Sequence, residues 1–404
     1  MHLSRRKLLA SIAVVSAAPV ARARAQAKST IKIGVLTDLS GTYRDNTGPT
    51  SVACCRQAVD EFATSHGLEV ELISADHQNK PDVAASIARQ WFDQGVDAIA
   101  DVPTSSVALA VSQVAKEKDR ILLDASAAAM EVTSGQCSPN TIVWSFDTYE
   151  KAQSTGGALV KAGDKSWFFI TADYVFGHSL EEQTAAVVKK YQGEVKGAAR
   201  YPFPDTADFS AFLQQAMASG ARVLGLANAG ADTVNCVKQA TEFGLNKRMR
   251  IAPLIMFLQD VHSIGLETAQ GLTTSETFYW DMNERTRAFT KRVLPKTPNN
   301  YPSQAHASAY AITLHYLKTV TALGPAEAKL SGRMTVARMK SIPTDDDAFG
   351  KGRIRIDGRG EFPSYLLQVK TPAESKGEWD LYKPIATTPA SEVVHPLESK
   401  CNFV

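Results

Sequence analysis

The sequence predicts an α/β protein with two doubly wound parallel-sheet lobes that are joined by a multi-stranded hinge. Strand-like runs alternate with helix-like runs in the first part of the chain, and the same alternation restarts after about residue 148. No Pro/Gly/Ser-rich linker separates the halves, so we expect the chain to cross between the lobes several times. A length of 404 residues is long for one domain and suits two.

The first half opens with an alternating β-branched run at 31–36, which predicts a strand, and a loop rich in Ser, Gly, Thr and Asn follows. After that loop we expect a helix at 51–65, a strand at 68–74, a helix at 81–94, a strand at 98–100, a helix at 105–118 and a strand at 121–124. Helices of this length between strands indicate a parallel sheet covered on both faces.

The second half repeats this pattern, beginning with a helix at 148–162 and a buried strand at 166–171. The other elements expected are helices at 177–191, 208–219 and 231–243 (with Gly244 as C-cap), and a strand at 222–226. Beyond residue 271 the pattern predicts a strand at 272–277, helices at 283–294 and 304–323, and a β-rich segment at 349–370. We therefore expect lobe one at 28–145 plus about 271–345, and lobe two at 146–270 plus about 346–404.

The N-terminal segment 1–27 predicts an export signal. Arg5, Arg6 and Lys7 precede a short apolar stretch at 8–18, and small residues suitable for cleavage follow. The apolar stretch is shorter than the roughly 20 residues that span a bilayer. The segment 4–9 resembles the twin-arginine export signal, with an ordinary signal peptide as the alternative, and either route predicts a periplasmic protein.

The overall composition argues against several classes of function. The net charge is only +2 and the basic residues are dispersed, so nucleic acid is not an expected partner. No phosphate-binding, dinucleotide-binding or catalytic metal motif is present, so we expect neither an enzyme nor a cofactor. We also expect the protein to be a monomer.

The cysteines suggest one disulfide and no metal site. Cys137 and Cys401 lie in loop-like contexts and are the favoured pair if a disulfide forms. Because no Cys/His spacing is typical of zinc ligands, no metal site is expected.

Several motifs carry a resemblance along nearly the whole chain. They are Ile-Gly-Val-Leu-Thr-Asp-Leu-Ser-Gly at 33–41, Trp-Phe-Phe-Ile-Thr-Ala-Asp-Tyr at 167–174, Lys-Gln-Ala at 238–240 and Trp-Asp-Leu-Tyr-Lys at 379–383. In this order and spacing they resemble the leucine/isoleucine/valine-binding type of ABC-transporter periplasmic proteins. The resemblance implies the type I periplasmic binding protein fold, a small ligand in the cleft between the lobes, and an ABC transporter membrane permease as partner. A periplasmic sensor subunit with the same clamp is the alternative.

The resemblance also implies ligand-binding residues on lobe one. Ser105 and Ser106 match the serine-rich loop that holds the ligand carboxylate, and a helix N-terminus offers free N–H groups there. The alternative is that Ser105 is merely a helix N-cap. In the next loop the family's threonine corresponds to Ala128, so Ser126 and Ala127 are expected to contact the ligand instead.

Aromatic residues from both lobes are expected to enclose the ligand: Tyr43 from lobe one, with Tyr174 and Phe176 from lobe two. In lobe two, Asn228 and Ala229 follow a strand at its carboxyl end and are further candidates.

Charged residues for a ligand ammonium are harder to find. Asp232 is either a ligand contact or a favourable helix-cap charge. The segment 254–260, where amino-acid-binding relatives place an acidic residue, is mostly apolar here, with Asp260 at its end. Because a buried ammonium without a carboxylate partner is costly, this segment favours an aromatic or aliphatic carboxylic acid as the ligand, with an amino acid as the alternative.

Overall fold

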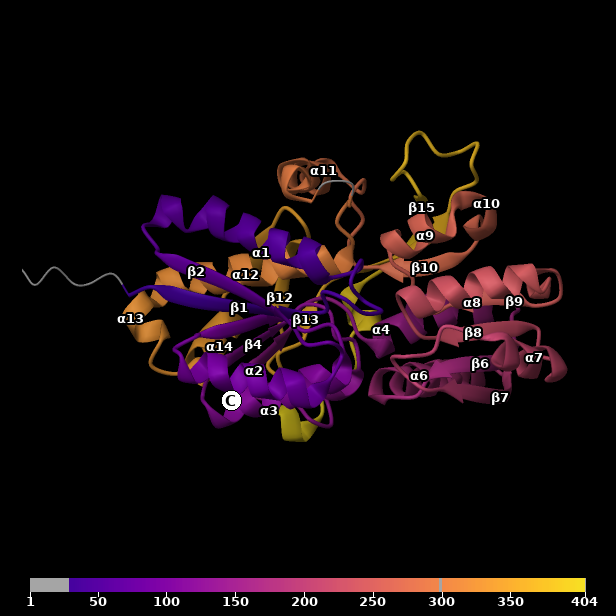
Figure 1. The fold of residues 1–404 in the computed structure, drawn as a ribbon, viewed down its shortest axis with the longest axis horizontal. Coiled ribbons are helices and arrows are strands. Elements are labelled where there is room, and N and C mark those ends of the chain that lie inside the picture. Colours follow the sequence, from indigo (N-terminus) through magenta and orange to yellow (C-terminus); the bar gives the residue numbers. More distant parts are fainter. Residues whose placement is uncertain (1–28, 298–299, 404) are drawn as a thin grey trace, which may run out of the picture.

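The computed structural model describes residues 29–297 and 300–403 and contains two parallel sheets that lie end to end (Figure 1). The expected export signal at 1–27 lies outside the described residues. None of the helices in the described ranges is long and apolar enough to cross a membrane.

The first sheet carries lobe one and is parallel throughout. Its strands, in spatial order, are β2 (Val70–Asp76), β1 (Ile31–Thr37), β3 (Ala98–Asp101), β4 (Ile121–Asp124) and β5 (Thr141–Val143). The helices α1 (Gly48–Phe62) and α12 (Gln304–Leu323) pack together on one face, while α2 (Pro81–Asp93) and α3 (Ser105–Glu117) pack on the other (Figure 1). Short elements continue this lobe: α11 (Glu284–Val293), α13 (Pro325–Ala328) and α14 (Gly332–Ser341).

The second sheet carries lobe two and is also parallel. Its strands, in spatial order, are β7 (Glu194–Tyr201), β6 (Ser166–Ala172), β8 (Val223–Ala227) and β9 (Arg250–Pro253). The surrounding helices are α4 (Thr148–Lys151), α5 (Gly157–Lys161), α6 (Val175–Lys190), α7 (Ser210–Ala218), α8 (Ala231–Glu242), α9 (Leu258–Ile264) and α10 (Leu266–Ala269).

Strand β6 shows why this sheet is covered on both sides. Trp167 and Phe169 pack into the core beneath α5 and α6, while Phe168 and Ile170 pack into the core beneath α7 and α8. Successive side chains of a strand point to opposite faces, so a strand that is apolar throughout requires helices on both.

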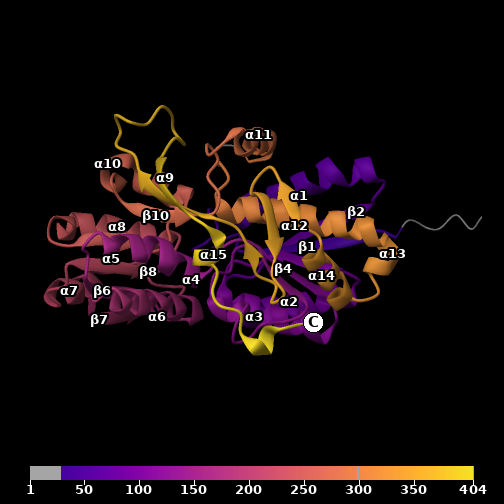
Figure 2. The ribbon, with the colours of Figure 1, turned by 180° about the vertical axis from the view of Figure 1, so that it is seen from behind.

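Two small antiparallel sheets complete the fold. One joins β10 (Thr273–Glu276), β14 (Ser364–Val369) and β15 (Tyr382–Thr388), and the other joins β11 (Thr344–Asp346), β12 (Gly350–Ile354) and β13 (Gly360–Glu361). The last short helix is α15 (Ala390–Val393). Seen from behind in Figure 2, the segment that follows α15 runs from the second lobe back to the first.

The division between lobes differs from the expected one near residue 346. Phe349, Ile354 and Phe362 pack in the core of the first sheet, although sequence placed them in lobe two. The C-terminal part begins to contribute to the second core at Tyr365 and Leu367. The strand pattern of this segment did not indicate which lobe it packs against, because β11, β12 and β13 form their own small sheet.

The chain end is fixed to lobe one by a disulfide. Cys137 and Cys401 are bonded, with 5.9 Å between their Cα atoms, and this is the pair that their sequence contexts favoured. The remaining cysteines, Cys54, Cys55 and Cys236, are buried and carry free thiols.

Candidate ligand-binding site

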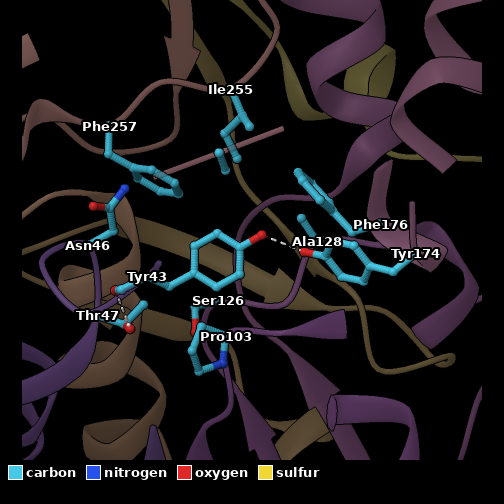
Figure 3. A pocket seen from close by; sticks show the side chains of 11 residues that line it. Tyr43, Asn46, Thr47, Pro103, Ser126, Ala128, Tyr174, Phe176, Ile255 and Phe257 are labelled. Atoms are coloured by element: carbon cyan, nitrogen blue, oxygen red, sulfur yellow. Dashed lines mark hydrogen bonds between the residues drawn. The ribbon is translucent and has the colours of Figure 1, made fainter. Parts of the chain in front are cut away.

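A small pocket, with a cavity volume of about 20 Å³, lies between the lobes. Side chains from both lobes line it: Tyr43, Asn46, Thr47, Pro103, Ser126 and Ala128 from lobe one, with Tyr174, Phe176, Ala229, Ile255 and Phe257 from lobe two. Figure 3 shows Tyr43 at its centre, with Ile255 and Phe257 on one side and Ser126 and Pro103 on the other. The lining is therefore mostly apolar and aromatic, with a few hydroxyl and amide groups.

Two tyrosines meet across the pocket. The hydroxyl groups of Tyr43 and Tyr174 are hydrogen-bonded at 2.5 Å (Figure 3). Phe203 stacks on both rings, with ring centroids 5.6 Å from Tyr43 and 4.3 Å from Tyr174. Burial is the main reason that the pKa of each hydroxyl lies above its ordinary value, so both remain protonated; one proton lies in the bond between them, and the other hydroxyl can donate to a ligand.

The loop after β1 positions Tyr43 and contacts lobe two directly. The carboxylate of Asp38 accepts hydrogen bonds from Gly41 N–H at 2.6 Å and Tyr43 N–H at 2.8 Å, which fixes the loop conformation. The N–H of Ala231, in the first turn of α8, donates to the carbonyl of Thr42 at 3.1 Å. This loop is thus held within lobe one and contacts lobe two directly in this structure.

The loops after β3 and β4 form the lobe-one wall. Strand β3 ends in left-handed backbone at Asp101 (φ 78°) and Val102 (φ 65°), a strained turn that brings Pro103 to the pocket. Ser126 Oγ–H donates to Asp101 Oδ1 at 2.6 Å. The N–H of Ala128 makes no hydrogen bond within the described part of the chain, so it is free for a ligand.

Ser105 is placed next to this wall and supports it. It begins α3, and its Oγ accepts a hydrogen bond from Ala129 N–H at 3.0 Å. Its role in the structure is therefore to hold the loop 126–129, and it does not line the pocket. The N-cap of α3 is Thr104, whereas sequence analysis offered Ser105 as the cap.

The structure brings only part of the expected set to the pocket. Tyr43, Ser126, Tyr174, Phe176 and Ala229 line it, whereas these expected residues do not: Ser105, Ser106, Ala127, Asn228 and Asp232.

The residues on lobe two that miss the pocket have partners inside their own lobe. Asn228 Oδ1 accepts from the Thr233 hydroxyl at 2.8 Å, and its Nδ2 lies 3.4 Å from Cys236 Sγ. Asp232 Oδ2 accepts from the Tyr201 hydroxyl at 2.7 Å. Burial raises the pKa of Asp232 to about 7.

The segment at 254–260 supplies apolar walls and keeps its acidic residue out of the pocket. Ile255 and Phe257 line the cavity. Asp260 is buried behind them, where its carboxylate accepts from Phe257 N–H at 2.8 Å and from the Asn46 amide at 3.0 Å. Burial raises the pKa of Asp260 to about 7. Asp260 thus links the lobes through Asn46 and does not face the ligand space.

Sequence reasoning missed several lining residues, namely Asn46, Thr47, Pro103, Ile255 and Phe257. Asn46 and Thr47 belong to the same loop as Tyr43, so their proximity to it was the available signal. Ile255 and Phe257 had been noted for their apolar character, which is the property that makes them pocket walls.

Two parallel-sheet lobes with a pocket lined from both sides define a hinged binding protein that encloses a small ligand. The chain belongs to the periplasmic binding protein family, whose model matches residues 30–378. The family resemblance and the fold class expected from the sequence are thereby confirmed.

Solved structures agree with this family. A periplasmic binding protein from Burkholderia mallei is 43% identical, with a TM-score of 0.87, and the match covers 91% of this chain and 96% of that chain. A branched-chain amino acid ABC transporter periplasmic ligand-binding protein from Burkholderia xenovorans is 36% identical, with a TM-score of 0.78 and coverage of 91% and 97%.

A more distant solute-binding protein of an ABC transporter from R. palustris, in complex with 4-hydroxybenzoate, shares the fold at 21% identity, with a TM-score of 0.80 and coverage of 89% and 97%. No curated protein sequence matches the chain.

Proposed function

We propose that the protein is the solute-binding component of an ABC importer and carries a small carboxylic acid to a membrane permease. The relative from Burkholderia xenovorans is named as such a transporter component, which supports transport over the alternative of a sensor subunit. Export to the periplasm by the twin-arginine route and function as a monomer are parts of the same proposal.

The single observation that carries the ligand class is the absence of an acidic side chain among the residues that line the pocket. An amino-acid ligand would bring an ammonium group, and burying it without a carboxylate partner costs several kcal/mol. Asp260, the nearest acidic residue of the segment 254–260, is already occupied by Asn46 and Phe257 N–H. The pocket therefore suits an acid without an ammonium group.

The same pocket offers donors for a carboxylate. The N–H of Ala128 is free, and helix α3 presents the unpaired N–H groups of its first turn at Ser105 and Ser106 beside the same wall. The rings of Tyr43, Phe176 and Phe257 suit an aromatic or aliphatic body on the ligand.

Closure brings these parts together. We propose that lobe one captures the carboxylate and that rotation about the crossing segments then brings the aromatic side chains of lobe two over the ligand. The closed form is what the permease would recognise, because only closure joins Tyr43 to Tyr174.

A thermal-shift screen tests the ligand class. One set of compounds contains neutral amino acids, and the other contains aromatic and short aliphatic acids, with benzoate as the first probe. A ligand at 100 times its dissociation constant stabilises the fold by about 2.7 kcal/mol, which gives a measurable shift. Melting-temperature shifts with amino acids alone would refute the assignment to acids without an ammonium group. No shift with either set would refute the proposal of a carboxylate ligand as a whole.

A matched pair of variants tests the site itself. Phe257→Ala removes a ring from the pocket wall and should abolish most of the ligand-induced shift. The control Phe243→Ala removes a ring that is 50% exposed at the C-terminal end of α8 and should leave the shift unchanged. Equal shifts in the two variants would place the ligand elsewhere.

A further inference from the structure

Asp101 is a buried carboxyl group directly behind the pocket wall. It is the last residue of β3 and is 0% exposed. Its Oδ1 accepts the hydrogen bond from Ser126, which lines the pocket, at 2.6 Å. Its Oδ2 is buried and makes no hydrogen bond of good geometry among the described residues, although the hydroxyls of Thr37 and Ser51 lie close to the carboxyl group. A buried carboxylate oxygen without a partner is expensive, so this group is poised to take up a proton.

The bond to Asp101 determines what Ser126 offers to a ligand. A serine hydroxyl has one proton, and here that proton is given to Asp101, so only the lone pairs of Ser126 Oγ remain for the pocket. An anionic ligand would then face an acceptor and, behind it, a buried negative charge. A proton on Oδ1 of Asp101 reverses the bond: Oδ1–H donates to Ser126 Oγ, Oδ2 is left as the oxygen of a neutral acid, and the Ser126 proton becomes available to the ligand.

The groups around Asp101 favour this uptake. Asp124 lies opposite it in the register of β3 and β4, is also fully buried, and likewise has an Oδ2 without a partner in the described ranges. Asp38 faces Asp101 from the loop after β1. The buried thiols of Cys54 and Cys55 face it from α1 and are neutral, because burial raises the pKa of both.

The charge of Arg359 acts on Asp124 and opposes proton uptake there, but Arg359 is itself paired with Asp147 at 2.6 Å. Burial, with the negative charge of Asp38 as a smaller cause, raises the pKa of Asp101 to about 6 against the opposing hydrogen bonds from Ser126, Thr37 and Ser51.

We propose that Asp101 is a positioning residue for the ligand site: ionised, it turns the Ser126 hydroxyl away from the pocket, and protonated, it releases that hydroxyl, so that an anionic ligand binds together with a proton. The proposal rests on the proposed function, since it requires a carboxylate ligand. The protonation state of Asp101 then sets both the affinity of the site and the ligand charge that it prefers.

The sign of the effect follows from linkage. Ligand binding favours protonated Asp101, so affinity is highest below the pKa of the free protein and falls by up to tenfold per pH unit above it. With that pKa at about 6, affinity for an anion should fall by roughly tenfold to a hundredfold between about pH 6 and pH 8.

Isothermal titration calorimetry with benzoate, in two buffers of different ionisation enthalpy at pH 7, measures the coupled proton directly. We expect net proton uptake by the wild-type protein and none with benzamide, which is neutral and nearly isosteric. Asp101→Asn should mimic the protonated state: proton uptake disappears, the pH profile becomes flat, and affinity at pH 8 rises at least tenfold. A merely structural role for Asp101 predicts the opposite change, a loss of affinity.

Two further variants sharpen the test. Ser126→Ala should bind benzoate more weakly than wild type at about pH 5.5, where the hydroxyl is a donor, and equally at about pH 8, where it is not. Asp346→Asn is the matched control, because Asp346 is a buried carboxyl of lobe one whose pKa burial also raises to about 6, remote from the pocket lining. This control should leave the proton uptake unchanged.

Carboxyl NMR titration of the ligand-free protein supplies a measurement that needs no ligand. An Asp101 signal that titrates in the ordinary aspartate range would overturn the proposal, as would benzoate binding with a flat pH profile and no proton uptake. Failure of benzoate and every other acid in the screen to bind would overturn the proposed function and this inference with it. Binding with a flat profile would overturn the inference alone.

Discussion

Gly230 lies where lobe two meets the loop after β1, and we expect Gly230→Ala to weaken ligand binding about tenfold to a hundredfold. An added Cβ would lie 2.5 Å from the carbonyl oxygen of Thr42 and 3.0 Å from Cδ1 of Tyr43. Relief of this overlap requires the lobes to part, which also breaks the hydrogen bond from Ala231 N–H to the Thr42 carbonyl. Overpacking and the lost bond together cost about 1.4–2.8 kcal/mol of closure free energy.

Backbone strain must be separated from this effect, and Gly244→Ala does so. Gly244 has φ of 68° and ψ of 20°, and an added Cβ there meets nothing within 4 Å, whereas Gly230 has φ of 63° and ψ of −139°, which is still less accessible to other residues. We expect Gly244→Ala to lose about 1–2 kcal/mol in the free energy of unfolding from left-handed backbone alone, and Gly230→Ala to lose more. Only Gly230→Ala should lose affinity in calorimetric titration with an acid that binds the wild type. Wild-type affinity in Gly230→Ala would show that the ligand-bound state lacks this contact.

Two stability predictions follow from buried groups. The double substitution of Cys137 and Cys401 by Ser should lower the free energy of unfolding by about 2–5 kcal/mol in urea titration, because their bond closes a sequence separation of 264 residues; an unchanged midpoint would contradict it. Stability should also fall as pH rises from about 4.5 to about 8, because burial raises the pKa of Asp232 and Asp260 to about 7 and of Glu276 to about 8, so within this window the folded state binds protons that the unfolded state has lost. Glu276→Gln should make this slope of melting temperature against pH shallower, and an unchanged slope would argue against a proton on Glu276.

The alternation of strands and helices was enough to predict the two parallel sheets, because both faces of each sheet are covered and the central strands are buried along their length. Strand β7 was not predicted, since as an edge strand it is half exposed and reads Glu-Val-Lys-Gly-Ala-Ala-Arg-Tyr. Strand β5 was missed because three residues give no periodicity to recognise. Elements whose burial is one-sided or whose length is short leave the weakest pattern in the sequence.

The candidate site was predictable to the level of loops, and individual side chains were not. The carboxyl ends of parallel strands identify the loops that hold Tyr43, Ser126 and Ala229, and all three line the pocket. Whether a polar residue in such a loop faces the ligand or its own lobe depends on partners that are distant in sequence. Ser105 and Asp232 show this, since one holds the loop at Ala129 and the other accepts from Tyr201.

The loop after β1 connects closure with ligand affinity. Its conformation is fixed within lobe one by Asp38, so closure does not have to bear the entropic cost of ordering this loop. It then contacts lobe two through Thr42, Tyr43 and Asn46. Because these contacts form between protein groups, weakening one of them shifts the closure equilibrium and should lower affinity for every ligand by the same factor. Substitution of Ile255 or Phe257, which line the pocket without joining the lobes to this loop, should instead change the ranking among ligands.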